Sequence, residues 1–390
     1  MKSLAIILVM FSFSLGLKSQ EVSGYVEAEG RYFFEEGTNP GQVQFYPSLA
    51  VELDYHSDFK GSNKEFNAVV FGRYDFLDQT RTHIDFREFY YQHNLGSAYT
   101  SIGIKKVFWG VVESLNVNDI INQKDFLEGI NGDAKLGELM WQNVFIRPFG
   151  TFETYFMPYH RPARFPGESG RLRPPIDTTD LDHDLYTNSL RHLYPSVVLR
   201  YKHSIGNMDL GINYSHLVSR EPVIEYGSGH PVVYYPIINQ IGGDIQYTLP
   251  GLLLKLEFNN RIYHGSKLAF VTGFEYTFGN VFNTGGDLGI ILEYLFDERG
   301  INTIRSMDND LFIGFRYSGN NIAGTQIVAG SIIDLSKSSR IYSIEVSHRL
   351  GSLIKLQLES KWFHNISNQE FIHLFENDSY IQLKLFLYLF

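Results

Sequence analysis

The sequence predicts an all-β protein, a single transmembrane antiparallel β-barrel of about 18 strands, with 16 strands as the alternative count. Three observations support this fold class. Apolar and polar residues alternate with period two from residue 22 to the end of the chain. The connections between predicted strands are alternately short and long. Aromatic residues are abundant, although the chain as a whole is only moderately hydrophobic.

The alternation is clearest in the C-terminal half of the chain. The even positions of the segment 288–296 are all aliphatic or aromatic, and Glu293 lies between them. In the last predicted strand, apolar residues occupy the odd positions of 381–389, with Gln382 and Lys384 between them. A soluble β-sandwich would explain any one such strand. A barrel with lipid outside and water inside explains why strand after strand has one apolar and one polar face.

The connections favour a barrel over a sandwich. If the N-terminus lies in the periplasm, the even-numbered connections are mostly hairpin-type turns, at 95–98, 148–151, 205–207, 249–251 and 350–352. The odd-numbered connections include the longest ones, at about 112–137, 165–192, 220–235, 298–309 and 366–378. Short periplasmic turns and long external loops are typical of outer-membrane barrels. A sandwich gives no reason for this alternation to stay in phase.

Composition excludes several other classes of protein. The 390 residues include 25 Tyr and 31 Phe, yet the hydrophobic fraction is 44% and the mean hydropathy is −0.15, which does not suit a helical membrane protein. The net charge of −10 argues against a nucleic-acid partner. The absence of Cys excludes disulfides and a lipoprotein anchor.

Both ends of the chain indicate export to the bacterial outer membrane. Residues 1–19 combine Lys2 with an apolar run, which predicts a cleaved signal peptide followed by a barrel domain over 20–390. The chain ends in Phe390 on an apolar strand, which resembles the signal recognised by the outer-membrane assembly machinery. Outer-membrane lipid and lipopolysaccharide are the expected surroundings.

The first long connection, about 112–137, is too polar for a core strand and too apolar for a solvated loop. We interpret it as a constriction loop folded into the lumen, with apolar residues against the wall and polar residues toward the channel. The polar set is Glu113, Asn116, Asn118, Asp119, Lys124 and Asp125. The alternative is an external loop packed on its neighbours.

The polar faces of the predicted strands give a charged lumen of mixed sign. In a wet lumen such charges cost little and tune selectivity, whereas in a dry interior each would need a partner. A packed interior with paired charges remains the alternative. The predicted lumen-facing residues are Arg200, Lys202, Lys255, Glu257, Glu275, Glu293, Arg316, Glu345, Lys355 and Glu359.

Four arginines gather in the second long connection, and guanidinium groups bind carboxylates and phosphates in bidentate fashion. Arg161, Arg164, Arg171 and Arg173 predict either an anion-attracting mouth, such as a clamp for lipopolysaccharide phosphates, or a solvated loop paired with the acidic run 177–184. That run alternates Asp180, Asp182 and Asp184 but lacks the spacing of a calcium loop. No metal site and no cofactor are predicted.

Catalysis would need a Ser or carboxylate nucleophile beside a His. No nucleophile-elbow or zinc-ligand spacing occurs, and the chain is predicted not to be an enzyme. An outer-membrane hydrolase and a non-conducting receptor or scaffold barrel remain the alternatives to a channel.

Two stretches carry a family resemblance. Lys105 to Ser114 (KKVFWGVVES) followed by 118–122 (NDIIN) resembles the strand-then-loop signature of uncharacterised porin-like outer-membrane barrels, which are distantly similar to the alginate-export porin group. Arg171–Arg173, 219–222 and 273–276 are similar to the same group. The resemblance implies a porin-like channel over nearly the whole mature chain. Alginate export implies a wide, basic path, whereas this predicted lumen carries as many acids as bases. We therefore expect small hydrophilic solutes or oligosaccharides.

Overall fold

The computed structural model describes residues 20–59, 62–130, 132, 134–174, 186–226, 231–281, 283–300 and 307–389. The predicted signal peptide, the acidic run 177–184 and the terminal Phe390 lie outside these residues. No helix in the described ranges is long and apolar enough to cross a membrane.

Eighteen strands form one antiparallel sheet, which confirms the predicted all-β barrel and its higher strand count. They are β1 (Gln20–Phe33), β2 (Phe45–Phe59), β3 (Lys64–Asp75), β4 (His83–Asn94), β5 (Ala98–Lys105), β6 (Glu138–Arg147), β7 (Gly150–Met157), β8 (Ser196–Ile205), β9 (Met208–Val218), β12 (Ile237–Leu249), β13 (Leu252–Ile262), β14 (Ser266–Val281), β15 (Gly286–Asp297), β16 (Asn309–Ser318), β17 (Gln326–Asp334), β18 (Arg340–Leu350), β19 (Ile354–His364) and β20 (Tyr380–Tyr388).

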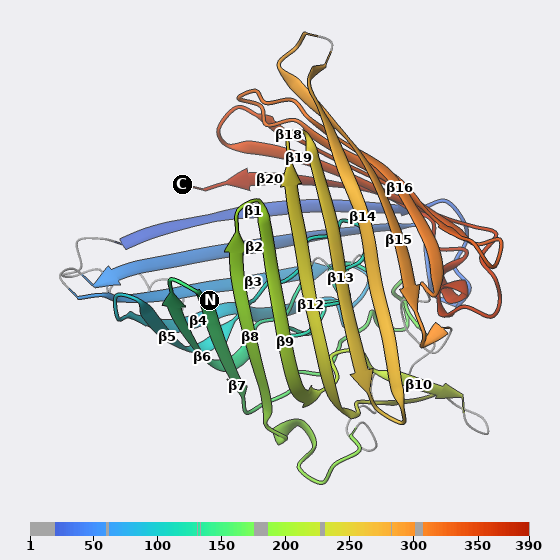
Figure 1. Ribbon diagram of the computed structural model, residues 1–390. Coiled ribbons are helices and arrows are strands. Elements are labelled where there is room, and N and C mark those ends of the chain that lie inside the picture. The colour runs from blue at the N-terminus through green and yellow to red at the C-terminus, as the bar shows by residue number, and fades with distance from the viewer. Residues whose placement is uncertain are drawn as a thin grey trace, which may run out of the picture.

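The sheet closes on itself between the first strand and the last. β1 pairs with β2 along one edge and with β20 along the other, for example through Tyr25 opposite Tyr388. Figure 1 shows the first and last strands side by side. Closure gives the first and the last strand a hydrogen-bonded neighbour on both sides, so neither of them is an edge strand.

Connections at the two ends of the barrel differ as the sequence predicts. Hairpin turns at one end contain glycines with positive φ, such as Gly251 (φ 72°) and Gly351 (φ 76°), a conformation that residues with a Cβ rarely adopt. The other end carries the long connections, which contain the hairpin β10 (Val223–Tyr226) and β11 (Pro231–Tyr234) and the short 3₁₀ helices η1 (Arg191–Leu193) and η3 (Phe371–Phe375).

Alternation along each strand separates an apolar outer face from an inner face. On β20, Leu383 is 51% exposed although it belongs to the apolar set, whereas the adjacent Gln382 is 2% exposed. Apolar side chains on the outside and polar ones inside are the reverse of a soluble domain. The inner faces also contribute apolar residues where connections fold against them, such as Ile291 and Leu295 on β15.

Candidate functional site: the segment between β5 and β6

The chain between β5 and β6 leaves the wall early. β5 ends at Lys105, so Val107 to Trp109, which appear strand-like in the sequence, lie outside it. β5 pairs with β4 only as far as Phe89, and the remaining part of β4 (83–88) faces the segment instead. The chain leaves the wall here because Trp109 packs inside the barrel. The centroid of its ring lies 5.8 Å from that of Tyr155 and 4.4 Å from the guanidinium carbon of Arg200. We call residues 106–137 the crossing segment.

The crossing segment starts and ends on neighbouring strands but bonds to the opposite wall. The Glu257 carboxylate on β13 accepts backbone N–H bonds from Val111 (2.7 Å) and Val112 (3.2 Å) through Oε1 and from Asn118 (3.2 Å) through Oε2. Glu293 on β15 accepts the backbone N–H groups of Glu113 and Ser114, both at 2.8 Å. β15 lies halfway around the sheet from β5, so this stretch of chain spans the interior.

Two glycines allow this close approach. A Cβ at Gly110 would lie 2.8 Å from Oε1 of Glu257 and 2.0 Å from Oδ1 of Asn116, and its φ of 127° disfavours a side chain. A Cβ at Gly242 on β12 would lie 2.3 Å from Oδ1 of Asn118. The backbone of the segment and the wall of the barrel therefore fit together only because these positions lack side chains.

On the β3–β4 wall, the chemistry is reversed, because the segment supplies carboxylates and the wall supplies arginines. Arg87 donates to Asp125 (2.5 Å), and Arg73 donates to both oxygens of Glu128 (2.9 and 2.7 Å). Burial by itself raises the pKa of Glu128, but the neighbouring Arg73 and Arg81 outweigh it and lower that pKa to about 2. Glu128 is therefore held as an anion.

Apolar side chains hold the segment between these two walls. Trp109, Ile120 and Ile121 pack with residues of β6 to β9 and β12, and Val112 and Val117 pack with residues of β14 to β16. Ile121 is fully buried. These contacts remove apolar surface from water.

The polar residues of the predicted constriction loop are placed differently from one another. Glu113 and Asn116 are half-buried, and Glu113 forms an ion pair with Arg316 while burial raises its pKa. Asn118, Asp119, Lys124 and Asp125 are buried and bonded, instead of facing open water. A buried polar group needs a partner, and the wall and the segment itself supply these partners.

Most of the predicted lumen-facing residues lie on the inner faces and form pairs there. The ion pairs are Arg200 with Asp244, Lys202 with Glu153, Lys255 with Glu275 (2.9 Å) and Arg316 with Glu275 (3.4 Å). Glu257 and Glu293 bind the segment as described. Lys355 lies over the Phe386 ring (5.7 Å), and Glu345 and Glu359 border a cavity.

A further charge cluster inside the barrel involves β1 and β3, which carry none of the predicted lumen-facing residues. Arg73 also contacts Glu27 (2.8 Å) and Glu29 (3.4 Å), and Arg81 from the β3–β4 connection pairs with Glu29 (2.8 Å). One feature of the sequence points to this cluster. Glu27, Glu29 and Arg31 alternate along the first strand, so all three side chains lie on the same face.

The four arginines of the second long connection do not form one cluster. Arg171 is buried and bonds to Asp378 (2.6 Å) and to the backbone carbonyls of Glu35 and Asn377, and its guanidinium lies over the Phe33 ring. Arg161 pairs with Asp85 (2.8 Å). Arg164 is exposed, and Arg173 is half-buried. Arg171 therefore bonds this connection to the residues just before β20, and its guanidinium group is buried from solvent.

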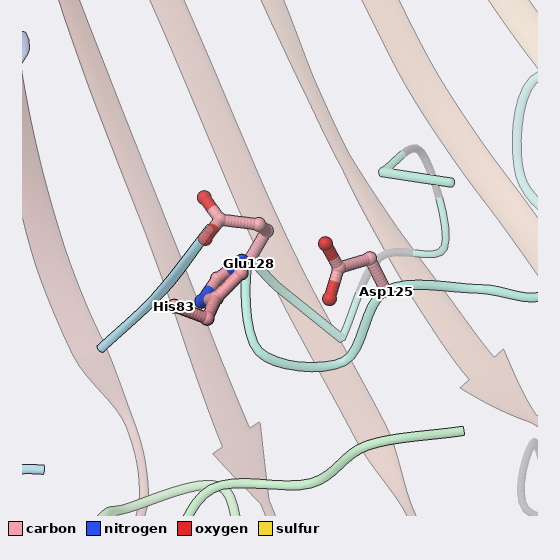
Figure 2. Close-up of side chains that lie close together, drawn as sticks. All are labelled: His83, Asp125 and Glu128. Atoms are coloured by element: carbon pink, nitrogen blue, oxygen red, sulfur yellow. The ribbon is translucent and has the colours of Figure 1, made fainter. Parts of the chain in front are cut away.

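Two groups of side chains in the described residues have ligand atoms close enough to surround a cation. His83, Asp125 and Glu128 form one, with these atoms within 4.8 Å of one another (Figure 2). Asp308, Asp310 and Asp334 form the other. In the first group, Arg87 donates a hydrogen bond to Asp125 and Arg73 donates one to Glu128. In the second group, Nζ of Lys337 lies 3.0 Å from Oδ1 of Asp308. Neither donor set suits a metal ion, because a bound cation would meet these fixed positive charges.

Two of the cavities beside the crossing segment bear on its role. The first, about 290 Å³, lies toward the short turns, with Tyr25, Glu52 and Gln357 in its lining; we call it the short-turn chamber. The second, about 220 Å³, is bordered by Phe165 and Phe371 from the long connections; we call it the long-loop chamber. Gly132 and Glu345 line both chambers.

Comparison with known proteins finds similarity of overall structure only. No family model matches the chain, and no curated protein is significantly similar to it in sequence. The resemblance to the alginate-export group thus stays a prediction. Among solved structures, a double mutant and a triple mutant of the porin of Rhodopseudomonas blastica match with TM-scores of 0.49 and 0.48, both at 11% identity, over 95% of this chain and 100% of theirs. At similarities this low, the overlays assign neither a family nor a function.

Proposed function

We propose that the chain is a bacterial outer-membrane channel through which small hydrophilic solutes diffuse, and that the crossing segment narrows its lumen. The observation that carries this proposal is the pair of carboxylates, Glu257 and Glu293, that accept backbone N–H groups of the segment from the far wall. A segment fixed at both walls restricts a barrel of 18 strands, which would otherwise enclose a wide aqueous channel.

The outer surface supports a place in a lipid bilayer. Aliphatic side chains such as Ile290, Ile313 and Leu385 are exposed along the strands. Exposed aromatic rings lie near both ends of the barrel, with Tyr74 and Phe76 at the end of β3 and Phe149 in the short turn after β6. An apolar band between two aromatic girdles is how membrane barrels meet lipid.

The interior supports a narrow passage. Its charges are paired across the wall and with the segment, so they define a fixed polar lining at low cost. The two chambers, about 290 and 220 Å³, suit small solutes better than oligosaccharides. The hydrolase alternative has no support at His216 and His160, because His216 bonds to Tyr194 and Asn239 and His160 bonds to Tyr186, and none of these partners is a Ser or a carboxylate.

Conductance in a planar lipid bilayer tests the channel. We expect small, stable single-channel currents from the full-length mature chain. Deletion of residues 113–136 removes the part of the segment bonded to Glu293 and Arg73, and we expect it to raise the conductance several-fold. A folded barrel that conducts nothing before and after the deletion would contradict the proposal and favour a receptor or scaffold. An unchanged conductance would place the segment outside the conducting path.

A further inference from the structure

The long-loop chamber has an unusual lining for the mouth of a hydrophilic channel. Most of its lining residues are apolar, including Phe165, Phe312, Ile332, Phe363, Phe371 and Phe375. The short-turn chamber, by contrast, has Glu27, Glu52, Arg87, Lys106 and Lys384 among its lining residues. A solute that moves from one to the other exchanges an apolar environment for a charged one.

The apolar lining comes from three hydrophobic clusters. One contains Phe363, Phe371 and Phe375 with the β18–β20 wall, a second contains Phe312 with the crossing segment, and a third contains Phe165 with Phe126 packed against it. Met307 and Ile332 pack against the first two. Apolar surface that faces water in an open cavity carries a free-energy cost. Occupation by an apolar body would recover that free energy.

The walls of the chamber are preformed by ring contacts. Phe126 of the crossing segment stacks on Phe165 with centroids 5.0 Å apart and an interplanar angle of 20°. Phe371 and Phe375 meet edge to face at 5.9 Å. Aromatic rings favour stacked or edge-to-face neighbours, so a further ring fits such walls.

Polar groups in the lining are few and balanced in charge. Ser343 and Lys361 lie opposite each other on β18 and β19. Glu113 and Glu345 are matched in number by Lys124 and Lys361. A lining of this kind can bind a hydroxyl group and does not select for either sign of charge.

We propose that the long-loop chamber binds a small neutral aromatic molecule bearing a hydroxyl group, of about the size of phenol. An apolar protein cavity of about 150 Å³ accommodates benzene, and the chamber measures about 220 Å³. The inference deepens the proposed channel function, because this chamber shares the lining residues Gly132 and Glu345 with the short-turn chamber. Binding itself does not require conduction.

Fluorine NMR of 4-fluorophenol, titrated against the full-length mature protein in lipid nanodiscs, tests the site. Empty nanodiscs measure partitioning into lipid. We expect saturable binding that excess glycerol does not displace. Ser343→Phe and Val328→Phe each place a ring in the chamber, and we expect each to weaken binding roughly tenfold or more. The matched control, Gln357→Phe, adds the same ring to the short-turn chamber and leaves the affinity unchanged.

Three results would overturn the inference: uptake equal to that of empty nanodiscs, equal affinity in all three folded variants, or displacement by glycerol. Two filling variants keep the test valid if one of them fails to fold. Saturable binding by a barrel that carries no current would refute the channel and leave the binding site standing. Current without binding would refute the binding site and leave the channel proposal standing.

Discussion

The two walls that hold the crossing segment do so with opposite chemistry. On β13 and β15, the wall supplies carboxylates and the segment supplies neutral backbone N–H groups. On β3 and β4, the wall supplies guanidinium groups and the segment supplies carboxylates. The first attachment depends on acceptor geometry, and the second depends on net charge. Substitutions and pH should therefore affect the two walls to different extents.

The largest effect is expected at Arg73, because its removal leaves Glu27, Glu29 and Glu128 without their shared cation. Loss of one partner from a buried charge cluster costs roughly 3–5 kcal/mol. We expect Arg73→Met to lower the free energy of unfolding, measured by urea titration in lipid vesicles, by that amount. Arg147→Met is the control, since Arg147 bonds only to the exposed turn at Ser97 and to the Ile146 carbonyl. Equal losses in the two variants would disprove the charge-cluster argument.

A smaller effect is expected at Glu257. Glu257→Ala leaves three backbone N–H groups of the segment without their acceptor, and because the loosened segment lets water reach them, the total cost is roughly 1–3 kcal/mol, that of one buried unpaired group. We expect the segment to loosen and the single-channel conductance to rise. Glu257→Gln keeps a carbonyl acceptor and should change the conductance much less. If the two variants behave alike, charge and not acceptor geometry holds this wall.

The pH dependence separates the walls further. The pKa of Glu128 is lowered from its ordinary value of 4.5 to about 2, so its stabilisation is present above pH 4.5 and is lost as the pH falls toward 2. We expect conductance recorded between pH 7 and pH 3 to rise as the pH falls below about 4.5, where Glu128 begins to lose its stabilising effect. Glu128→Gln cannot titrate and should lose most of this acid response. If the Glu128→Gln variant shows the same acid response as the unsubstituted chain, a titratable group other than Glu128 causes that response.

The smallest effect is expected at Lys202. Its side chain is 47% exposed and pairs with Glu153. Exposed ion pairs contribute about 0–1 kcal/mol. Lys202→Ala should therefore leave both the free energy of unfolding and the conductance nearly unchanged. A loss as large as that of Arg73→Met would show that exposure is a poor guide to charge energetics in this barrel.

Much of the candidate site could be located from the sequence, but its bonding could not. The mixed polarity of 112–137 identified the segment, and alternation placed Glu257 and Glu293 on inner faces. Sequence does not show that Asp125 and Glu128 meet Arg87 and Arg73, because these partners are 38 and 55 residues apart along the chain. It also does not distinguish Arg171, buried against Asp378, from the exposed Arg164.

Period-two alternation and turn chemistry are local properties of the chain, so the sequence predicts a closed barrel of about 18 strands, with 16 as the alternative. The same alternation predicts which face of each strand meets the apolar surroundings. The path of the crossing segment, the pairing of the charges and the aromatic lining of one chamber follow from the tertiary structure alone. These features depend on contacts between residues far apart in sequence, and closure of the barrel brings those residues together.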